Sequence, residues 1–507
     1  MLCESVQKNP KFNQKNLNKS LNFAFKFGII SLLSLNGSFI HAETLSYIQA
    51  EQKVLTESFT TQANQALEQA SLLQSEAVKG LGLPTIDFNV RALSYHTKID
   101  APLSSLKGNL DNSLVDSVNN QIDQWQSNNS SLISPQDADA IKQGTSQVIS
   151  EGIGLIPNSY EFTLKDQMVR PSVSFIMPLY TGGLISNAKE LAKLQVQKSK
   201  LSTKQQQDLQ KFEVIQTYFA VQLQKQLYKS SQFNAKAMQR HYDNALKLEQ
   251  QGFISKGQRM QFEVARNDAL RILQSTDIAY KTSLFRLNNL LQSSQITDLS
   301  TPLFINSSQN QDLNTLLTSF EENSNLIRQL KMDTQLADVN VKTQYAAKKP
   351  TVFAFGEYSL ENNENWIVGV AASYNLFSGV NKSKNIQAAE LQKRATELLT
   401  SRTKQEIETI IYTSYNEISN SLKSHQLLEN NIQAAQENLR IQELSFKEDM
   451  ASATQVIDAQ NALTTIHSEM ALNSYKYIIS LATLLQNYGS IDLFQTYINQ
   501  PNTHYIR

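Results

Sequence analysis

The sequence predicts a mainly α-helical chain with a small β part, built as two internal repeats of helix, strand, strand, long helix and helix. Short segments that alternate apolar and polar residues run into long polar segments twice, and the second run lies 197 positions after the first. The long segments 184–301 and 380–488 hold no proline, and the second holds no glycine either. The residues identical at this offset are Val173/Val370, Leu179/Leu376, Gly182/Gly379, Ser186/Ser383, Ala192/Ala389, Leu194/Leu391 and Gln195/Gln392.

The composition excludes several classes of protein. The chain has 507 residues with 46 basic and 46 acidic side chains, so no positive field favours nucleic acid. Its one cysteine, Cys3, lies in the predicted leader, which leaves the rest of the chain without thiol chemistry. The six histidines show no metal-ligand spacing, and no phosphate-binding or nucleophile motif is present. We therefore expect no enzyme, no cofactor, no metal site and no nucleic-acid partner.

Residues 1–42 have the order of a secretory signal peptide. Five lysines and a single acid, Glu4, precede the apolar run Gly28–Leu35, and Ala42 offers a cleavage site before Glu43. The apolar run is too short to span a bilayer as a helix. A disordered tail with an apolar patch is the alternative interpretation. The signal peptide predicts that the rest of the chain is exported.

The first repeat covers residues 43–301. A helix over 44–80 is followed by a strand over about 85–95, because Gly80, Gly82 and Pro84 break the helix. The strand has one apolar and one polar face. A helical hairpin over 184–295 closes the repeat and turns near Gly252.

A long polar segment over 97–168 separates the first strand from a second one over about 169–179. It is rich in asparagine, serine and aspartate, with possible helical turns near 112–127 and 136–152. A loop of this length is uncommon in a compact core. We expect it to be an insertion at the cell surface.

The second repeat covers residues 302–490 and follows the same plan. Strands over about 351–359 and 366–376 are joined by a tight polar loop, and a helical hairpin over 380–488 follows. Residues 449–452 align with 252–255 at the same offset, so both hairpins turn at the same distance from the strands. Residues 491–507 form a carboxy-terminal tail.

The four strands cannot close a barrel of useful bore by themselves. Three chains supply twelve strands with no free edge, and strands of about 10 residues have the length that crosses an outer membrane when tilted. The long polar helices then continue the wall of the barrel away from the membrane. The sequence therefore predicts a trimeric 12-stranded β-barrel continued by an α-helical tunnel.

Two sets of motifs resemble the TolC-like family of outer-membrane efflux proteins. They are the paired strand-to-helix junctions at 178–183 and 375–380, and the stretches 252–265 and 446–460 after the hairpin tips. The resemblance covers 44–490. It implies a homotrimeric channel-tunnel in the Gram-negative outer membrane, with its helices in the periplasm. It also implies a periplasmic adaptor (membrane fusion) protein, an inner-membrane drug–proton antiporter or ABC exporter, and outer-membrane lipid as partners.

By this resemblance, several residues near the tips are expected to form the periplasmic entrance. The family pattern Asp-Val-Leu-Asp-Ala stands here as Gln455-Val456-Ile457-Asp458-Ala459, so Asp458 is expected to form an acidic ring and Gln455 replaces the other acid. The residues expected to make a ring or gate are Asp458, Gln455, Arg259, Asp449 and Glu448. Solvated charges at a helix tip are the alternative.

The resemblance also assigns the tips and the barrel interior. The tips, expected to dock the adaptor, are Gly252, Phe253, Ile254, Met450, Ala451 and Ser452, and packing of helix on helix is the alternative. The polar residues Asp87, Asn89 and Arg91 are expected to face the barrel lumen. We therefore expect the exit duct of a tripartite efflux or type I secretion system, a passive conduit driven by the inner-membrane partner. A secreted trimeric coiled-coil stalk or adhesin is the alternative.

Overall fold

In the computed structural model, the described residues are 43–94, 104–127, 135–153, 167–293, 296–308, 312–360 and 365–506. The predicted signal peptide, 1–42, lies outside them. The predicted fold class is confirmed: the chain is mostly helical, and helix–strand–strand–long helix–helix occurs twice. Among the described residues, no helix combines the length and the apolar character needed to cross a membrane.

The first repeat begins with a short strand and two helices where one helix over 44–80 was expected. Ser58 separates the helices because its hydroxyl accepts a hydrogen bond from the backbone N–H of Thr61 and caps the second one. The elements are β1 (Glu43–Leu45), α1 (Tyr47–Glu57), α2 (Phe59–Ala77), η1 (Val78–Gly80), β2 (Thr85–Ser94), α3 (Ser104–Ser127), α4 (Pro135–Ile153), β3 (Gln167–Tyr180), α5 (Leu184–Gln250), α6 (Lys256–Leu290) and β4 (Ile296–Leu299).

The second repeat has the same order without the inserted helices. Its long helix has 66 residues and that of the first repeat has 67. The elements are β5 (Leu303–Asn306), α7 (Leu313–Asn323), α8 (Asn325–Ala346), β6 (Thr351–Ser359), β7 (Trp366–Ser373), α9 (Lys382–Lys447), α10 (Ala453–Tyr488), η2 (Ile491–Leu493), α11 (Phe494–Ile498) and β8 (Thr503–Ile506).

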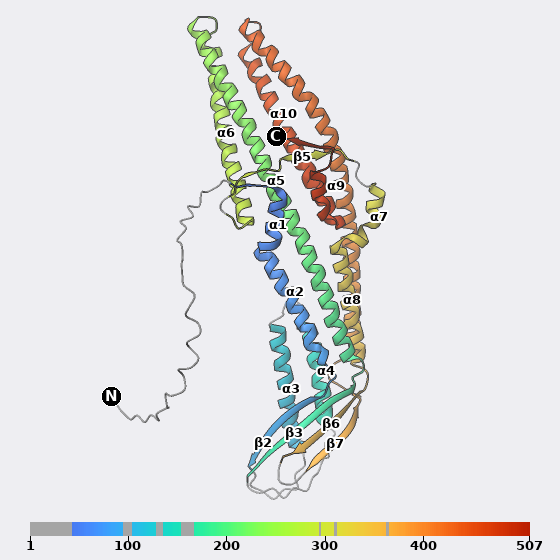
Figure 1. Ribbon diagram of the computed structural model, residues 1–507. Coiled ribbons are helices and arrows are strands. Elements are labelled where there is room, and N and C mark those ends of the chain that lie inside the picture. Colours follow the sequence, from blue (N-terminus) through green and yellow to red (C-terminus); the bar gives the residue numbers. More distant parts are fainter. Residues whose placement is uncertain are drawn as a thin grey trace, which may run out of the picture. The chain divides into compact units, whose positions relative to one another are not determined.

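A four-stranded antiparallel sheet in the order β2–β3–β6–β7 joins the two repeats. It lies at one end of the helices, and the two hairpin tips lie at the other end, as Figure 1 shows. The pairing of Asp87 with Ser174 and of Ser174 with Glu357 places polar residues of three strands on one face. The neighbouring pairs, such as Phe88 with Val173 and Val173 with Tyr358, place apolar residues on the other face.

The main core lies part-way along α5. Tyr218 and Phe219 of that helix are fully buried against Tyr47, Phe304 and Phe494, with ring centroids 5.2–6.0 Å apart. Tyr47, Phe304 and Phe494 come from α1, β5 and α11. The cluster therefore ties both ends of the described chain to the longest helix.

Two small sheets beside this core were not expected from the sequence. β1 pairs with β4 in parallel, and β5 pairs with β8 antiparallel, with Leu303 opposite Ile506. Residues 491–506 are therefore two short helices and a strand that close the core, where a tail was expected. Tyr477 supports this region because its hydroxyl donates to the carbonyl oxygen of Asn306 at 3.0 Å.

The segment between β2 and β3 differs most from expectation. Its described part is a helical hairpin of α3 and α4 that packs beside α2 and α5 and against β6 (Figure 1). We expected it at the cell surface, beyond the strand ends. These two helices instead lie on the same side of the sheet as the polar residues, next to the sheet–helix junction. Apolar residues of α4 cover this junction.

Candidate functional site

One face of the sheet is apolar and is exposed in the single chain. Strand β2 contributes no charged residue to this face between Ile86 and Ala92. The exposed fraction is 64% for Phe88, 69% for Trp366 and 68% for Val370. Other members of this face include Val90, Val169, Pro171, Val173, Phe175, Met177, Val352, Ala354, Gly356, Tyr358, Val368 and Ala372. A continuous apolar surface of this kind marks contact with lipid or with another protein.

The opposite face is polar in the half farthest from the helices. Arg91 Nη1 lies 3.3 Å from Glu357 Oε1, and Asn89 Nδ2 donates to Ser174 Oγ at 3.0 Å. Asp87, the third residue expected in a lumen, points to this same side and lines a cavity beside the sheet. The three predicted lumen residues therefore share one face of the sheet.

The half of this face nearest the helices is apolar and is covered by α4. Phe353 is buried with 1% of its surface exposed, and an added Cβ at Gly152 would lie 2.8 Å from its ring. The Thr351 hydroxyl donates to Glu151 Oε2 at 3.2 Å. Only glycine therefore fits where α4 crosses the ring of Phe353.

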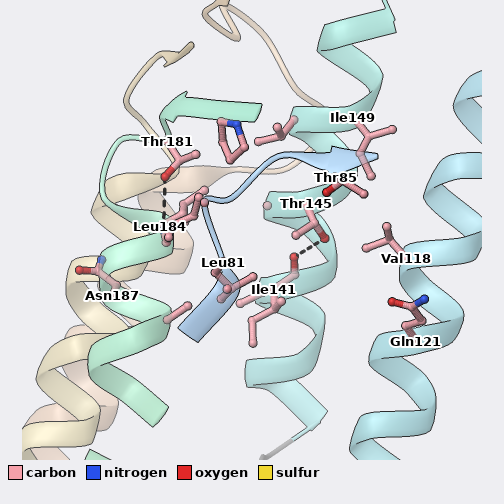
Figure 2. Close-up of a pocket in the computed structure, with 18 of the residues that line it drawn as sticks. Leu81, Thr85, Val118, Gln121, Ile141, Thr145, Ile149, Thr181, Leu184 and Asn187 are labelled. Carbon is pink, nitrogen blue, oxygen red and sulfur yellow. Dashed lines mark hydrogen bonds between the residues drawn. The ribbon is translucent and has the colours of Figure 1, made fainter. Parts of the chain in front are cut away.

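A cavity of about 480 Å³ lies between the α3–α4 hairpin and the rest of the chain. Figure 2 shows that Val118 and Gln121 of α3, and Ile141, Thr145 and Ile149 of α4, line it on one side. The other side is lined by the α2–β2 connection and by the β3–α5 junction, including Leu81, Thr85, Thr181, Leu184 and Asn187. A second cavity of about 340 Å³ lies farther along, between the hairpin, α2 and α5.

The two hairpin tips have the same backbone geometry. Gly252 has φ +78° and Asp449 has φ +58°, both in the left-handed region. In each tip the next residue donates to a carbonyl five positions back, Phe253 to Leu248 at 2.9 Å and Met450 to Ser445 at 2.8 Å. This pattern is the Schellman helix ending. The predicted alignment of 449–452 with 252–255 therefore corresponds to one turn formed twice.

Both tips then start the next helix with a capping box. Ser255 accepts from the backbone of Gln258, whose side chain accepts from the backbone of Ser255, and Ser452 and Gln455 repeat the arrangement. Gln455, which was expected in the entrance ring, thus caps α10 in this structure. The spacing Ser-x-x-Gln is the signal from which this role is predictable.

The tip residues expected to dock a partner fall into two groups. Phe253 is 69% exposed and Met450 is 75% exposed at the two outermost turns. Ile254 packs on the cluster of Ala245, Phe262, Ala453 and Val456, and Ala451 is buried. Gly252 and Ser452 shape the turn and the cap. The tips therefore offer two exposed apolar side chains held by a rigid base.

The charged residues expected at the entrance do not pair with one another within the chain. Arg259 bonds to Glu249 at 2.9 Å and to Glu263, both in its own hairpin. Glu448, Asp449 and Asp458 are exposed. The two acids that hold Arg259 were not singled out in the sequence, although Arg259 and Glu263 have the i, i+4 spacing of helix ion pairs.

Aromatic packing joins the hairpins below their tips. The rings of Phe262 and Phe446 are 5.3 Å apart in an edge-to-face contact. His241 of α5 lies 3.6 Å from Glu443 of α9, and burial lowers the pKa of this histidine despite the nearby carboxylate. Movement of one hairpin against the other must break this cluster.

Residues 316–490 match the sequence model of a family described as outer membrane efflux protein. No curated protein matches the chain. Among solved structures, VceC of Vibrio cholerae, an outer membrane protein, is similar at 11% identity and a TM-score of 0.68, over 87% of this chain and 96% of its own. The Neisseria gonorrhoeae MtrE outer membrane channel, described in its open state, is similar at 14% identity and 0.65, over 88% and 89%. The Campylobacter jejuni CmeC outer membrane channel gives 10% and 0.65, over 89% of both chains.

These matches confirm the predicted resemblance to TolC-like proteins and support the predicted location in a Gram-negative outer membrane. The family match covers most of the second repeat, and the structural matches extend the same fold to the first.

Proposed function

We propose that this chain, a member of the outer membrane efflux protein family by its second repeat, forms the outer-membrane exit duct of a tripartite efflux or type I secretion system. The observation that carries the proposal is the exposed apolar face of the sheet. Lipid is the environment that stabilises such a face, and the polar face with Arg91 and Glu357 then lines an aqueous lumen.

The open edges of the sheet support a trimer. In the described strand order, β2 and β7 each pair on one side only. Unpaired edges are unfavourable in lipid because no water replaces the missing hydrogen bonds. Three copies joined β2 to β7 make twelve strands and leave no edge.

The hairpin tips are the proposed contact with a periplasmic adaptor, which links the duct to an antiporter or ABC exporter in the inner membrane. Phe253 and Met450 supply the exposed apolar contacts. Asp458, which is exposed about two turns after the second tip, is the proposed ring of three carboxylates at the entrance. Arg259 is paired with Glu249 and Glu263 of its own hairpin, so it is not the partner of Glu448 or Asp449. In this proposal, Glu448 and Asp449 therefore close the entrance by contacting residues of a neighbouring copy.

A test of the duct uses the chain purified in detergent. The expected result is a trimer by light scattering with ion conductance in planar bilayers, because a closed barrel encloses water. Replacing Asp458 by asparagine should weaken cation preference and divalent-cation block. A water-soluble monomer without conductance contradicts the duct, and unchanged selectivity in the Asp458→Asn variant contradicts the ring alone.

A further inference from the structure

The two strand pairs of the sheet differ in what joins them. Leu360 and Asn365 flank the short connection of β6 to β7, whereas β2 and β3 are connected through α3 and α4. The hairpin of α3 and α4 lies on the polar side of the sheet and reaches past the sheet–helix junction along α2 and α5. The same side of the wall is the lumen in the proposed function.

The hairpin is a unit of its own. Lys142 of α4 forms an ion pair with Asp123 of α3, and Ser146 donates to Asn119 at 3.3 Å. These polar contacts join the two helices to each other without residues of the wall.

Its seat on the wall is close at two points and open between them. Gly152 lies on the ring of Phe353, and an added Cβ at Gly144 would lie 3.3 Å from Leu184 Cδ1. The two cavities, of about 480 and 340 Å³, lie behind the rest of the hairpin. Side chains that border a void lose dispersion contacts on that side, so this seat is held less tightly than a packed core. The two cavities therefore leave part of the hairpin without close contact to the wall.

We propose that the α3–α4 hairpin is a displaceable plug of the duct, seated on the lumen wall where the barrel meets the tunnel. This rests on the proposed function. Twelve strands about 4.8 Å apart and tilted by about 40° make a barrel with a backbone diameter of roughly 24 Å. At the level of the sheet, where α4 packs on β6 and β7, three helices of about 10 Å diameter pack side by side within a circle of roughly 22 Å. Three seated hairpins thus fill the bore, and transport requires them to leave their seats.

The experiment compares conductance in planar bilayers for three forms of the full chain. The first is unchanged. In the second, a short polar linker joins Ser94 to Gln167 and replaces the hairpin, as in the second repeat. In the third, Gly144→Cys and Leu184→Cys are joined by a short bis-thiosulfonate linker. The linker reacts only with these two introduced cysteines, because the only natural cysteine, Cys3, lies in the predicted leader. A control pair, Tyr345→Cys and Glu390→Cys, takes the same linker between α8 and α9, where their side chains bond at 2.8 Å.

The deletion is expected to raise the single-channel conductance several-fold. The linked hairpin is expected to hold the conductance at its lowest level until a reductant releases it, and the control pair is expected to have no effect. Equal conductance of the unchanged and deleted forms overturns the plug, as does a linked form that conducts like the control. If neither the unchanged nor the deleted form conducts, the duct itself fails. Should the deletion not assemble, the reversible linked pair still decides.

Discussion

The two repeats make the same two backbone turns with different residues. Each long hairpin has a Schellman ending at its tip and another after its return helix, and each ending needs a left-handed residue. The first repeat has Gly252 at its tip and Gln292 at its second ending, whereas the second repeat has Asp449 and Gly489 in the same places. Both pairs are 197 positions apart.

This comparison shows that the repeats share geometry more strictly than sequence. Gln292 and Gly489 each donate to a carbonyl three positions back, at 3.1 Å in both repeats. Glycine adopts the left-handed conformation without strain, while other residues are strained there by about 1–2 kcal/mol. Each repeat therefore keeps glycine at one turn and tolerates strain at the other.

The largest expected effect tests whether both repeats present their apolar strand faces to lipid. Val90→Lys in the first repeat and Val370→Lys in the second should each cost about 2–4 kcal/mol per chain, and three times that per trimer, because a charge enters the bilayer. Asn89→Lys, on the opposite face of the same strand, is the matched control. Trimer yield and heat resistance on gels measure the loss. If Asn89→Lys is as damaging as Val90→Lys, the assignment of the faces is wrong.

The next effect separates the two glycines. An added Cβ at Gly489 would lie 2.2 Å from the carbonyl oxygen of Asn323, so Gly489→Ala adds a backbone clash to the strain of a left-handed residue. We expect a loss of about 3 kcal/mol, measured by thermal unfolding in detergent. Gly252 has open space around it, so Gly252→Ala should lower the stability only by the strain of a left-handed alanine, about 1 kcal/mol. Equal losses at the two positions contradict the comparison.

A smaller effect tests whether Asp449 is kept for its charge or for its turn. Asp449→Gly should raise the stability of the second tip by up to about 1 kcal/mol, because it relieves a left-handed non-glycine residue. Asp449→Asn keeps the backbone preference and removes the charge. If both variants leave the block of conductance by divalent cations unchanged, Asp449 acts only in the backbone turn. Loss of block in both variants assigns it to the entrance.

The smallest effect concerns pH. Burial is the main cause that lowers the pKa values of His241 in the first repeat and His425 in the second, although Glu443 and Glu429 lie nearby. The unfolded chain therefore binds protons at a pH where the folded chain does not, and stability falls as pH drops below about 6.5. We expect a lower melting temperature at pH 5 than at pH 7.5. His241→Gln and His425→Gln should each reduce this difference, and variants that keep the full difference contradict the assignment.

Much of the fold could be predicted from the sequence because periodicity and helix breakers mark its elements. The alternation around Phe88 predicts a strand, and the absence of breakers from 380 to 488 predicts two long helices. The left-handed turn at Asp449 could be predicted because it aligns with Gly252. These signals are local or repeated, so one sequence contains them.

The rest depends on contacts between distant segments. The pairing of Leu303 with Ile506 has no signal in either short stretch. The position of α4 depends on the fit of Gly152 to Phe353, while the polar composition of its segment is typical of surface loops. Gln455 was assigned by resemblance to the entrance, although Ser452 three positions earlier already indicates a capping box.

The equal lengths of α5 and α9 constrain how this protein changes in evolution. A deletion of seven residues from each arm of one hairpin shifts its tip by about 10 Å relative to the other tip. The rim would then be uneven, and a partner that rests on all its points would meet only half of them. Insertions and deletions in related chains should therefore change both hairpins together, so that the two tips stay level.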